Sequence, residues 1–139
     1  MKIRNRFGDI IFKTGHKTLK ATVEAAVREG MSLCGADLAD ANLEGARLSG
    51  ADLAYADLEG SDLRRADLRT ANLRDANLSG ADLAGADLAG AALIWSNLSG
   101  AVLRGVKLEG ADLRCAFLWG AILKQAGLRG VMPQTHMET

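Results

Sequence analysis

The sequence predicts an all-β solenoid over residues 31–130, a fold in which the backbone winds repeatedly around one apolar core. The first observation is spacing, because leucine occupies every fifth position from Leu33 to Leu128, twenty times in succession. The second is that alanine stands two residues before nearly every leucine, with Asp or Asn most often between them. The third is that glycine is the commonest residue two positions after the leucine.

A period of five fits neither regular secondary structure. On an α-helix, with about 100° per residue, successive leucines would rotate by about 140° and cover every side. In a straight strand, an odd period sends successive leucines to opposite faces. We therefore expect the chain to turn once per repeat, with Ala and Leu pointing inward and the residue between them pointing outward. Glycine then supplies the positive φ that a tight corner requires.

Residues 1–30 predict a small N-terminal cap on the solenoid, in which short strands are followed by a helix and extend the cover that the helix provides. Residues 2–13 contain two β-forming runs, 3–7 and 10–12, which Gly8-Asp9 separates. This pattern predicts a β-hairpin or two short strands.

Residues 18–29 predict the helix of this unit, with Thr18 as the N-cap and Gly30 as the stop. Its apolar stripe is formed by Leu19, Val23 and Val27. A free helix of about twelve residues is marginal in water. We therefore expect this stripe to cover the N-terminal end of the solenoid as a cap.

Charge and composition limit the classes of protein to which this chain can belong. Lys plus Arg equals Asp plus Glu at 17 each, so no global field attracts nucleic acid or an anionic membrane. No run approaches the roughly 18 apolar residues that a membrane helix needs, and the N-terminus lacks a secretory apolar region. We expect a cytoplasmic protein that binds neither membranes nor nucleic acid directly.

The repeats ADLAGADLAGAAL and ANLRDANLSGADL resemble those of the pentapeptide-repeat family, whose unit is A[DN]LxG. This resemblance implies a right-handed quadrilateral β-helix with four pentapeptides per coil, and hence about five coils for twenty repeats. Non-glycine residues after the leucine recur every twenty positions, as Tyr55, Asp75, Trp95 and Cys115 do, which agrees with that coil length. The expected core includes Leu33, Leu38, Leu53, Leu73, Leu78, Leu93 and Leu113. The segment IRNRFGDIIF with its following helix also resembles small bacterial and phage members of the family.

Outward positions become large and apolar over the last two predicted coils. The candidate interface consists of Ile94, Trp95, Val102, Phe117, Trp119 and Ile122. Exposed apolar patches mark association sites, and some family members dimerise end to end through their C-terminal coils. We therefore expect a homodimer through these coils. The alternative is an irregular last coil whose large side chains fold over the end. Residues 131–139 are predicted to be a short tail in which Pro133 discourages further strand pairing.

The sequence predicts no catalytic, cofactor-binding or metal site. His16 and His136 lie near opposite termini and have no metal-ligand spacing. Cys34 and Cys115 lie four coils apart, about 19 Å at the usual strand spacing, which is too far for a disulfide. Carboxylates stack at many repeats, but on a convex surface without a cleft. We expect a protein that is not an enzyme.

Two functional hypotheses follow. The first is a non-catalytic protein-interaction scaffold that presents outward ladders of side chains to an unknown protein partner. The second is implied by the resemblance, since several family members are acidic rods that mimic DNA and modulate DNA gyrase: this chain would modulate a topoisomerase or another DNA-binding enzyme. A DNA mimic should present a continuous negative strip. Seven outward arginines interrupt the acid here and favour the first hypothesis: Arg64, Arg65, Arg69, Arg74, Arg104, Arg114 and Arg129.

Overall fold

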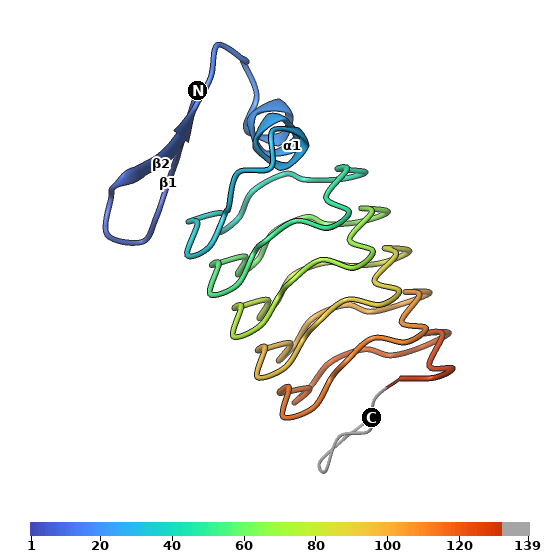
Figure 1. Cartoon of the computed structure of the whole chain (residues 1–139). Helices are drawn as coiled ribbons and strands as arrows, with labels where there is room; N and C mark the ends of the chain where they lie inside the picture. Colours follow the sequence, from blue (N-terminus) through green and yellow to red (C-terminus); the bar gives the residue numbers. More distant parts are fainter. Residues whose placement is uncertain (132–139) are drawn as a thin grey trace.

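The structure is a computed structural model, and it describes residues 1–131. Two short strands, β1 (Lys2–Arg4) and β2 (Ile10–Lys13), are followed by one helix, α1 (Leu19–Arg28). After α1 the chain winds in stacked coils toward the C-terminus (Figure 1). The tail predicted at residues 131–139, with Pro133, lies outside the described residues except for its first position.

Backbone hydrogen bonds stack residues that are twenty apart. Fifteen parallel bridges join the outward positions of successive coils, for example Asp57 to Asn77. The N–H of Leu58 donates to the carbonyl of Asn77 at 2.7 Å, and the N–H of Asn77 donates to the carbonyl of Ala56 at 2.9 Å. One coil therefore takes twenty residues, which is four pentapeptides. Each extended piece is one bridge long, so the coils have no long strands of their own.

The core is a stack of leucine and alanine side chains. The seven leucines expected at the core are between 0% and 1% exposed. Burying one leucine side chain stabilises the fold by on the order of 1.5–3 kcal/mol. Burial weakens at the C-terminal end, where Leu123 is half-buried and Leu128 is 40% exposed.

Every corner of the solenoid has a residue in the left-handed conformation. All twenty residues that follow a repeat leucine by two positions have φ between 55° and 71°. Twelve of them are glycine, as the corner requires. The other eight adopt the same conformation at a cost of about 1–2 kcal/mol each; they are Asp40, Tyr55, Arg65, Thr70, Asp75, Trp95, Cys115 and Gln125.

The Asp or Asn before the leucine also builds the corner. Its side-chain oxygen accepts the backbone N–H two residues later, as Asp62 Oδ1 does from Arg64 at 3.1 Å and Asn77 Oδ1 from Ser79 at 3.1 Å. This contact is an Asx turn, which Asp and Asn form because their side chains are short. The sequence indicated the outward direction of these residues but not this second role.

The N-terminal strands form an antiparallel hairpin in which Ile3 pairs with Phe12. Asn5 organises the turn, because its Oδ1 accepts the N–H groups of Phe7 and Asp9, both at 2.9 Å. The first strand is therefore shorter than the predicted run of residues 3–7, since residues 5–9 belong to the turn.

The hairpin continues one side of the solenoid. Asn5 forms an antiparallel bridge with Ala36, and the N–H of Asp37 donates to the carbonyl of Arg4 at 2.7 Å. The strand β1 thus occupies the edge that the first coil would otherwise expose, and such pairing satisfies backbone groups of a sheet edge.

The ends of α1 follow the predicted signals. Thr18 Oγ1 accepts the N–H of Ala21 at 3.1 Å. At the other end Gly30 has φ +71°, its N–H donates to Val27, and the N–H of Met31 donates to Ala26. These two bonds form a Schellman motif, which satisfies the last carbonyls of the helix.

The buried face of α1 is broader than the predicted stripe and consists mainly of small residues. Val23 is fully buried, together with Thr22, Ala25 and Ala26, whereas Leu19 and Val27 are half-buried against the core. The helix lies close to the coils, because Glu24 Oε1 accepts the N–H of Arg47 at 2.9 Å. Small side chains permit this close approach.

Candidate interaction surface

One side of the solenoid lies directly below the hairpin, and we call it the hairpin face. Its central column is linked by parallel bridges and begins at the residue beside β1. The face has three columns. They are Gly35, Tyr55, Asp75, Trp95 and Cys115 at the leading corner; Asp37, Asp57, Asn77, Asn97 and Phe117 at the centre; and Ala39, Glu59, Ser79, Ser99 and Trp119 at the trailing corner.

The structure divides the six residues of the candidate interface between neighbouring sides. Three of them lie on the hairpin face, where Trp95 is 50%, Phe117 54% and Trp119 72% exposed. Val102 and Ile122 form a bridge with each other on the next column, where Val102 is half-buried and Ile122 is 43% exposed. Ile94 is half-buried at the corner that borders the hairpin face.

The aromatic residues at the C-terminal end point into solvent. The alternative of large side chains folded over the last coil requires buried rings, yet Trp119 is 72% exposed. Among residues 1–131, the leucines nearest that end are also the least covered. The described part of the chain therefore presents its aromatic residues sideways and leaves the end of the leucine stack open.

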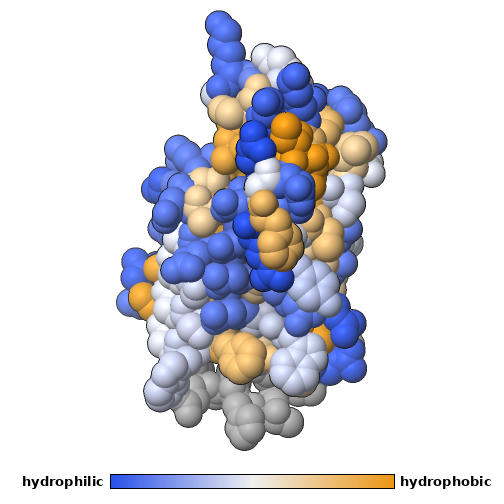
Figure 2. All heavy atoms as spheres, turned by 90° about the vertical axis from the view of Figure 1, so that its left-hand side faces the viewer, coloured by the Kyte–Doolittle hydropathy of each residue, from blue (hydrophilic) through white to orange (hydrophobic). Residues whose placement is uncertain are grey.

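All four aromatic residues of the repeats lie on the hairpin face, because Tyr55, at 54% exposure, occupies the same corner column as Trp95. Phe7 in the hairpin turn is 78% exposed, and the Arg6 guanidinium lies 5.2 Å from its ring centroid. Figure 2 views the side of the molecule on which the hairpin lies, and ring-bearing side chains gather toward the C-terminal end of the solenoid.

A groove separates the hairpin turn from the hairpin face. It encloses about 140 Å³ and is lined by Arg6, Tyr55, Ala56, Asp57, Asp75 and Asn77. An aromatic ring, two carboxylates and the Arg6 side chain thus border one small recess.

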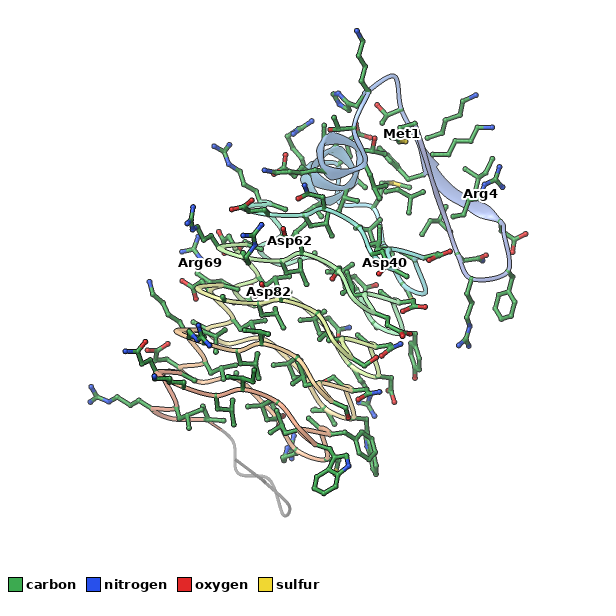
Figure 3. All side chains as sticks on the ribbon, turned by 180° about the vertical axis from the view of Figure 1, so that it is seen from behind. Met1, Arg4, Asp40, Asp62, Arg69 and Asp82 are labelled. Carbon is green, nitrogen blue, oxygen red and sulfur yellow. The ribbon has the colours of Figure 1, made fainter. Side chains whose placement is uncertain are left out.

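On the other sides of the solenoid, arginine forms close ion pairs with three of the outward carboxylates. Arg64 pairs with Asp62 at 2.6 Å, and the same spacing of two residues pairs Arg69 with Asp67 and Arg114 with Asp112, both at 2.7 Å. These hydrogen bonds from arginine hold the pKa of each of the three carboxyls below its ordinary value of 3.8. Asp62 and Asp82 share the column next to the hairpin face, and Arg69 lies one side further on; Figure 3 shows all three away from the hairpin itself.

The hairpin face lacks this compensation. Its central and trailing columns contain no Lys, Arg or His. Among residues 1–131, no basic side chain lies within 4.0 Å of the carboxylates of Asp37, Asp57 or Glu59. At the leading corner, Asp75 pairs with the bordering Arg74 at 3.4 Å. The face therefore runs from uncompensated acid near the hairpin, through Asn and Ser, to aromatic residues.

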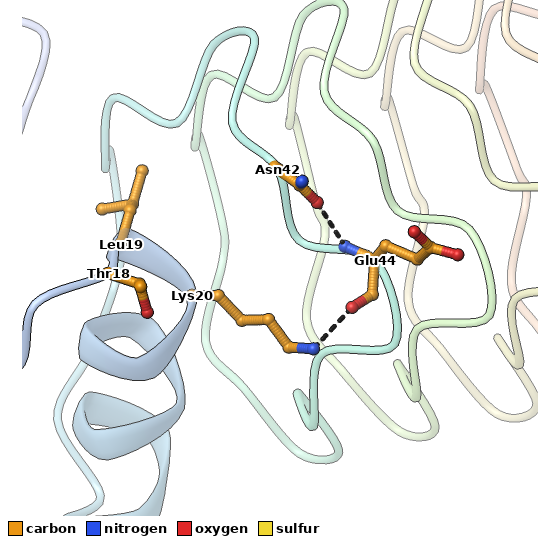
Figure 4. A pocket seen from close by; sticks show the side chains of 5 residues that line it. All are labelled: Thr18, Leu19, Lys20, Asn42 and Glu44. Carbon is orange, nitrogen blue, oxygen red and sulfur yellow. Dashed lines mark hydrogen bonds between the residues drawn. The ribbon is translucent and has the colours of Figure 1, made fainter.

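A wider pocket lies between α1 and the first repeats (Figure 4), lined by Thr18, Leu19, Lys20, Asn42 and Glu44. The Lys20 ammonium donates to the carbonyl of Glu44 at 2.6 Å, and Asn42 Oδ1 accepts the Glu44 N–H at 3.2 Å. Its polar groups thus join the helix to the solenoid.

The sequence model of pentapeptide repeats matches residues 32–69, 66–105 and 101–131. The chain belongs to the pentapeptide-repeat family. No curated protein matches it. Among solved structures, Rfr23 from the cyanobacterium Cyanothece 51142 is 39% identical with a TM-score of 0.56, over 71% of this chain and 60% of that one. A pentapeptide repeat protein from the thylakoid lumen of Arabidopsis thaliana is 30% identical with a TM-score of 0.56, over 70% of this chain and 67% of that one.

A third solved structure is HetL from Nostoc sp. strain PCC 7120, a pentapeptide repeat protein involved in heterocyst differentiation regulation. It is 38% identical with a TM-score of 0.45, over 77% of this chain and 55% of that one. This pentapeptide-repeat chain thus spans between half and two thirds of the two cyanobacterial relatives. Its fold is consistent with the right-handed β-solenoid of the family.

Other chemistry-bearing groups of this pentapeptide-repeat protein are dispersed. Cys34 and Cys115 are free and exposed. Within the described range, no three His, Cys, Asp or Glu side chains cluster as metal ligands, and no helix is long and apolar enough to cross a membrane. The hairpin face is the surface on which aromatic and uncompensated acidic groups come together.

Sequence reasoning identified Trp95, Phe117 and Trp119 but did not place Tyr55 or Phe7 with them. The signal for Tyr55 was present, because it lies forty residues before Trp95 and therefore two coils away in one column. Phe7 could not be placed this way, since its position depends on the docking of the hairpin.

Proposed function

We propose that this pentapeptide-repeat protein is a non-catalytic protein-interaction scaffold, and that the C-terminal part of the hairpin face contacts a partner protein. The supporting observation is the gathering of Trp95, Phe117 and Trp119, each at least half exposed, on one side of a regular rod. Exposed apolar patches mark association sites. Trp is also enriched among residues that dominate the binding energy of interfaces.

Backbone geometry supports the same proposal. Tyr55 and Trp95 have φ of 60° and 62° at corners where glycine is the usual residue. The core does not need a ring at either position, since both side chains are about half exposed. Strained residues that persist without a packing reason point to function.

The proposal leaves catalysis out because the repeat carboxylates already have structural tasks. Asp62 accepts the Arg64 backbone N–H at 3.1 Å and also pairs with its guanidinium. In the proposed scaffold, residues 31–130 form about five coils, residues 1–30 form their N-terminal cap, and residues 131–139 are a separate tail. A reducing, cytoplasmic location fits the two exposed free cysteines, Cys34 and Cys115.

Site-specific photocrosslinking tests the scaffold. The photoreactive residue p-benzoylphenylalanine replaces Trp119 in one variant of the full chain and Arg69, on another side, in the control. The proposal expects a crosslinked partner protein for position 119 and none for position 69. Equal crosslinking at both positions, or no crosslinked protein at position 119, would contradict it.

A homodimer is a second candidate, and a different observation favours it. Leu128 is 40% exposed at the C-terminal end, and among residues 1–131 the N–H groups of Leu118 and Leu123 have no backbone acceptor. A second copy with the same open end would cover the leucine layer. Light scattering with size-exclusion chromatography tests this candidate. Leu128→Glu should convert a dimer into a monomer, Arg129→Glu should not, and a monomeric wild type would refute the dimer.

The DNA-mimic alternative lacks comparable support. Arginine pairs with one carboxylate on each of three sides, and the uncompensated acids of the central and trailing columns on the hairpin face end at Glu59. A short acidic segment of this kind differs from the continuous negative strip that a DNA mimic needs.

A further inference from the structure

We propose that the hairpin face binds an extended segment of a partner protein that carries an arginine or lysine and, about four residues away, a large apolar side chain. The cation enters the groove beside the hairpin turn, and the apolar side chain packs among Trp95, Phe117 and Trp119. This inference rests on the proposed scaffold function and specifies its ligand.

Charge complementarity favours a basic partner. The trailing position of the face holds Ala39, Glu59, Ser79, Ser99 and Trp119, whereas the equivalent position on the other sides holds arginine at Arg64, Arg69, Arg74 and Arg114. The carboxylates of Asp57 and Glu59 share the amide of Asn77, at 3.3 Å each, and have no ion pair among the described residues. An incoming cation therefore meets the carboxylates of Asp57 and Glu59, which have no ion pair among residues 1–131. Arg6, the cation that already lines the groove, lies over the Phe7 ring and forms no ion pair with either of them.

The groove adds an aromatic wall to these carboxylates. Tyr55 lines it together with Asp57 and Asp75, and Phe7 stands exposed at the tip of the hairpin turn. A cation gains from an aromatic face within about 6 Å of the ring centroid. The Arg6 guanidinium already lies at 5.2 Å from the Phe7 ring, so Tyr55 is the ring that the groove offers to an incoming cation.

The opposite end of the face suits an apolar side chain. Trp95 flanks the central column at one corner and Trp119 at the other, with Phe117 between them one coil below Asn97. Each of the three rings is at least half exposed, and no charged residue stands in the central or trailing column beyond Glu59. A leucine or aromatic side chain of the partner would cover these rings.

The repeat sets the spacing between the two ends. Asp57 and Phe117 are three coil steps apart, about 14 Å at the usual strand spacing of about 4.8 Å. An extended peptide advances about 3.3 Å per residue, so about four residues span this distance. Asn77 and Asn97 lie between and offer side-chain amides to the peptide backbone.

Nucleic acid is a poor occupant of the same surface. Bases stack well on exposed aromatic rings, but the phosphate backbone requires basic residues to track it. The central and trailing columns contain none, and three carboxylates, Asp37, Asp57 and Glu59, stand at their hairpin end.

The test uses the full chain and three synthetic peptides: Arg-Ser-Gly-Ser-Leu, its charge-reversed form Glu-Ser-Gly-Ser-Leu, and Arg-Leu-Ser-Gly-Ser with the two anchors adjacent. Binding is followed by chemical-shift changes of the backbone amides in NMR spectra. The first peptide should shift amides of the hairpin face and bind at least tenfold more tightly than the other two. Equal binding of the charge-reversed peptide, or shifts on another side, would overturn the proposal.

Variants then separate the two anchors. Asp57→Asn keeps the acceptor for the Glu59 N–H but removes the charge, and should weaken the first peptide severalfold; Trp119→Ala should do the same. Asp82→Asn, the matched substitution on the neighbouring column, should leave binding unchanged. Tighter binding of a thymidine decamer than of the peptide, or loss of peptide binding on dimer formation, would also overturn the proposal. Crosslinking at position 119 without peptide binding would refute this ligand while the scaffold function stands.

Discussion

The two ends of the solenoid are built from the same pentapeptide but differ in what lies beyond them. At the N-terminal end, Leu33 is fully buried, Val23 of α1 joins the same core, and β1 pairs with the first coil through Ala36. At the C-terminal end, Leu128 has the same place in its repeat and is 40% exposed. The position of a residue in the repeat therefore determines whether its side chain points inward. The structure that packs on its coil determines how far that side chain is buried.

The difference between the two ends indicates where the solenoid can expose large apolar side chains with little loss of stability. In solenoids each coil contacts mainly its neighbours, so a coil with one neighbour contributes less to the cooperative fold. Large apolar side chains at that end, such as Trp119, cost little folding energy to present and remain accessible. The following predictions test this contrast, beginning with the largest effect.

Leucine substitutions should behave oppositely in the middle and at the open end. Leu78→Asp should unfold the rod, because Leu78 is fully buried and a carboxylate there loses its water without gaining a partner. Leu128→Asp should lower the free energy of unfolding by less than about 1 kcal/mol, as expected for an exposed site. Thermal melts followed by circular dichroism measure both, and a wild-type melt for Leu78→Asp would refute the inward assignment.

Disrupting α1 should open the N-terminal end. Val23→Asp should cost about 3 kcal/mol or more, since Val23 is fully buried against the first coil. Hydrogen exchange should then show residues 31–50 losing protection before residues 71–90. Ile122→Asp, at the other end, serves as the control. In this variant residues 31–50 should keep their wild-type protection relative to residues 71–90. Equal protection in both variants would mean that the helix does not support the coils.

Corner substitutions should report how firmly each coil is held. Gly80→Ala should cost about 1 kcal/mol, because Gly80 has φ +65° with open space around its Cβ position. Gly120→Ala should cost less, since its coil can open locally without unfolding the rest. Gly15, which also has open space but no positive φ, is the matched control, and Gly15→Ala should be neutral. Urea titrations measure all three, and equal losses at positions 80 and 120 would remove the contrast.

The smallest effect concerns ion pairs and pH. The Arg69 hydrogen bond holds the pKa of Asp67 below 3.8, so the ionised pair stabilises the fold above that pH and is lost as the pH falls through the lowered value. Asp67→Asn should cost less than about 1 kcal/mol at pH 7, as surface pairs do, and nothing at pH 2. Asp112→Asn, near the C-terminal end, should lower the free energy of unfolding by even less in the same urea titrations. A loss that persists at pH 2 would assign the effect to packing instead.

Local rules predicted much of this architecture. Leucine spacing indicated the inward residues, glycine marked the corners, and Thr18 and Gly30 marked the ends of the helix. The Asx turns escaped because they depend on a corner geometry that period alone does not describe. The strands were expected to belong to the N-terminal cap, but their pairing partner at Ala36 was not predicted, since no local propensity specifies a contact thirty residues away.

Prediction of the candidate site was less complete for a related reason. Trp119 and Ile122 are three residues apart in sequence, yet a corner sends them to different sides. Tyr55 and Trp95 are forty residues apart and share one column. Surface neighbours in a solenoid follow the coil length, which only the bridges between coils establish.

The twenty-residue bridge pattern has a consequence for how such a chain tolerates insertions. Duplicating twenty residues would lengthen the rod and keep every outer column in line. Duplicating five would leave the leucine core equally well packed but advance all later repeats by a quarter turn, and Phe117 would leave the line that begins at Asp37. The core of this protein is indifferent to multiples of five, whereas its outer surface is preserved only by multiples of twenty.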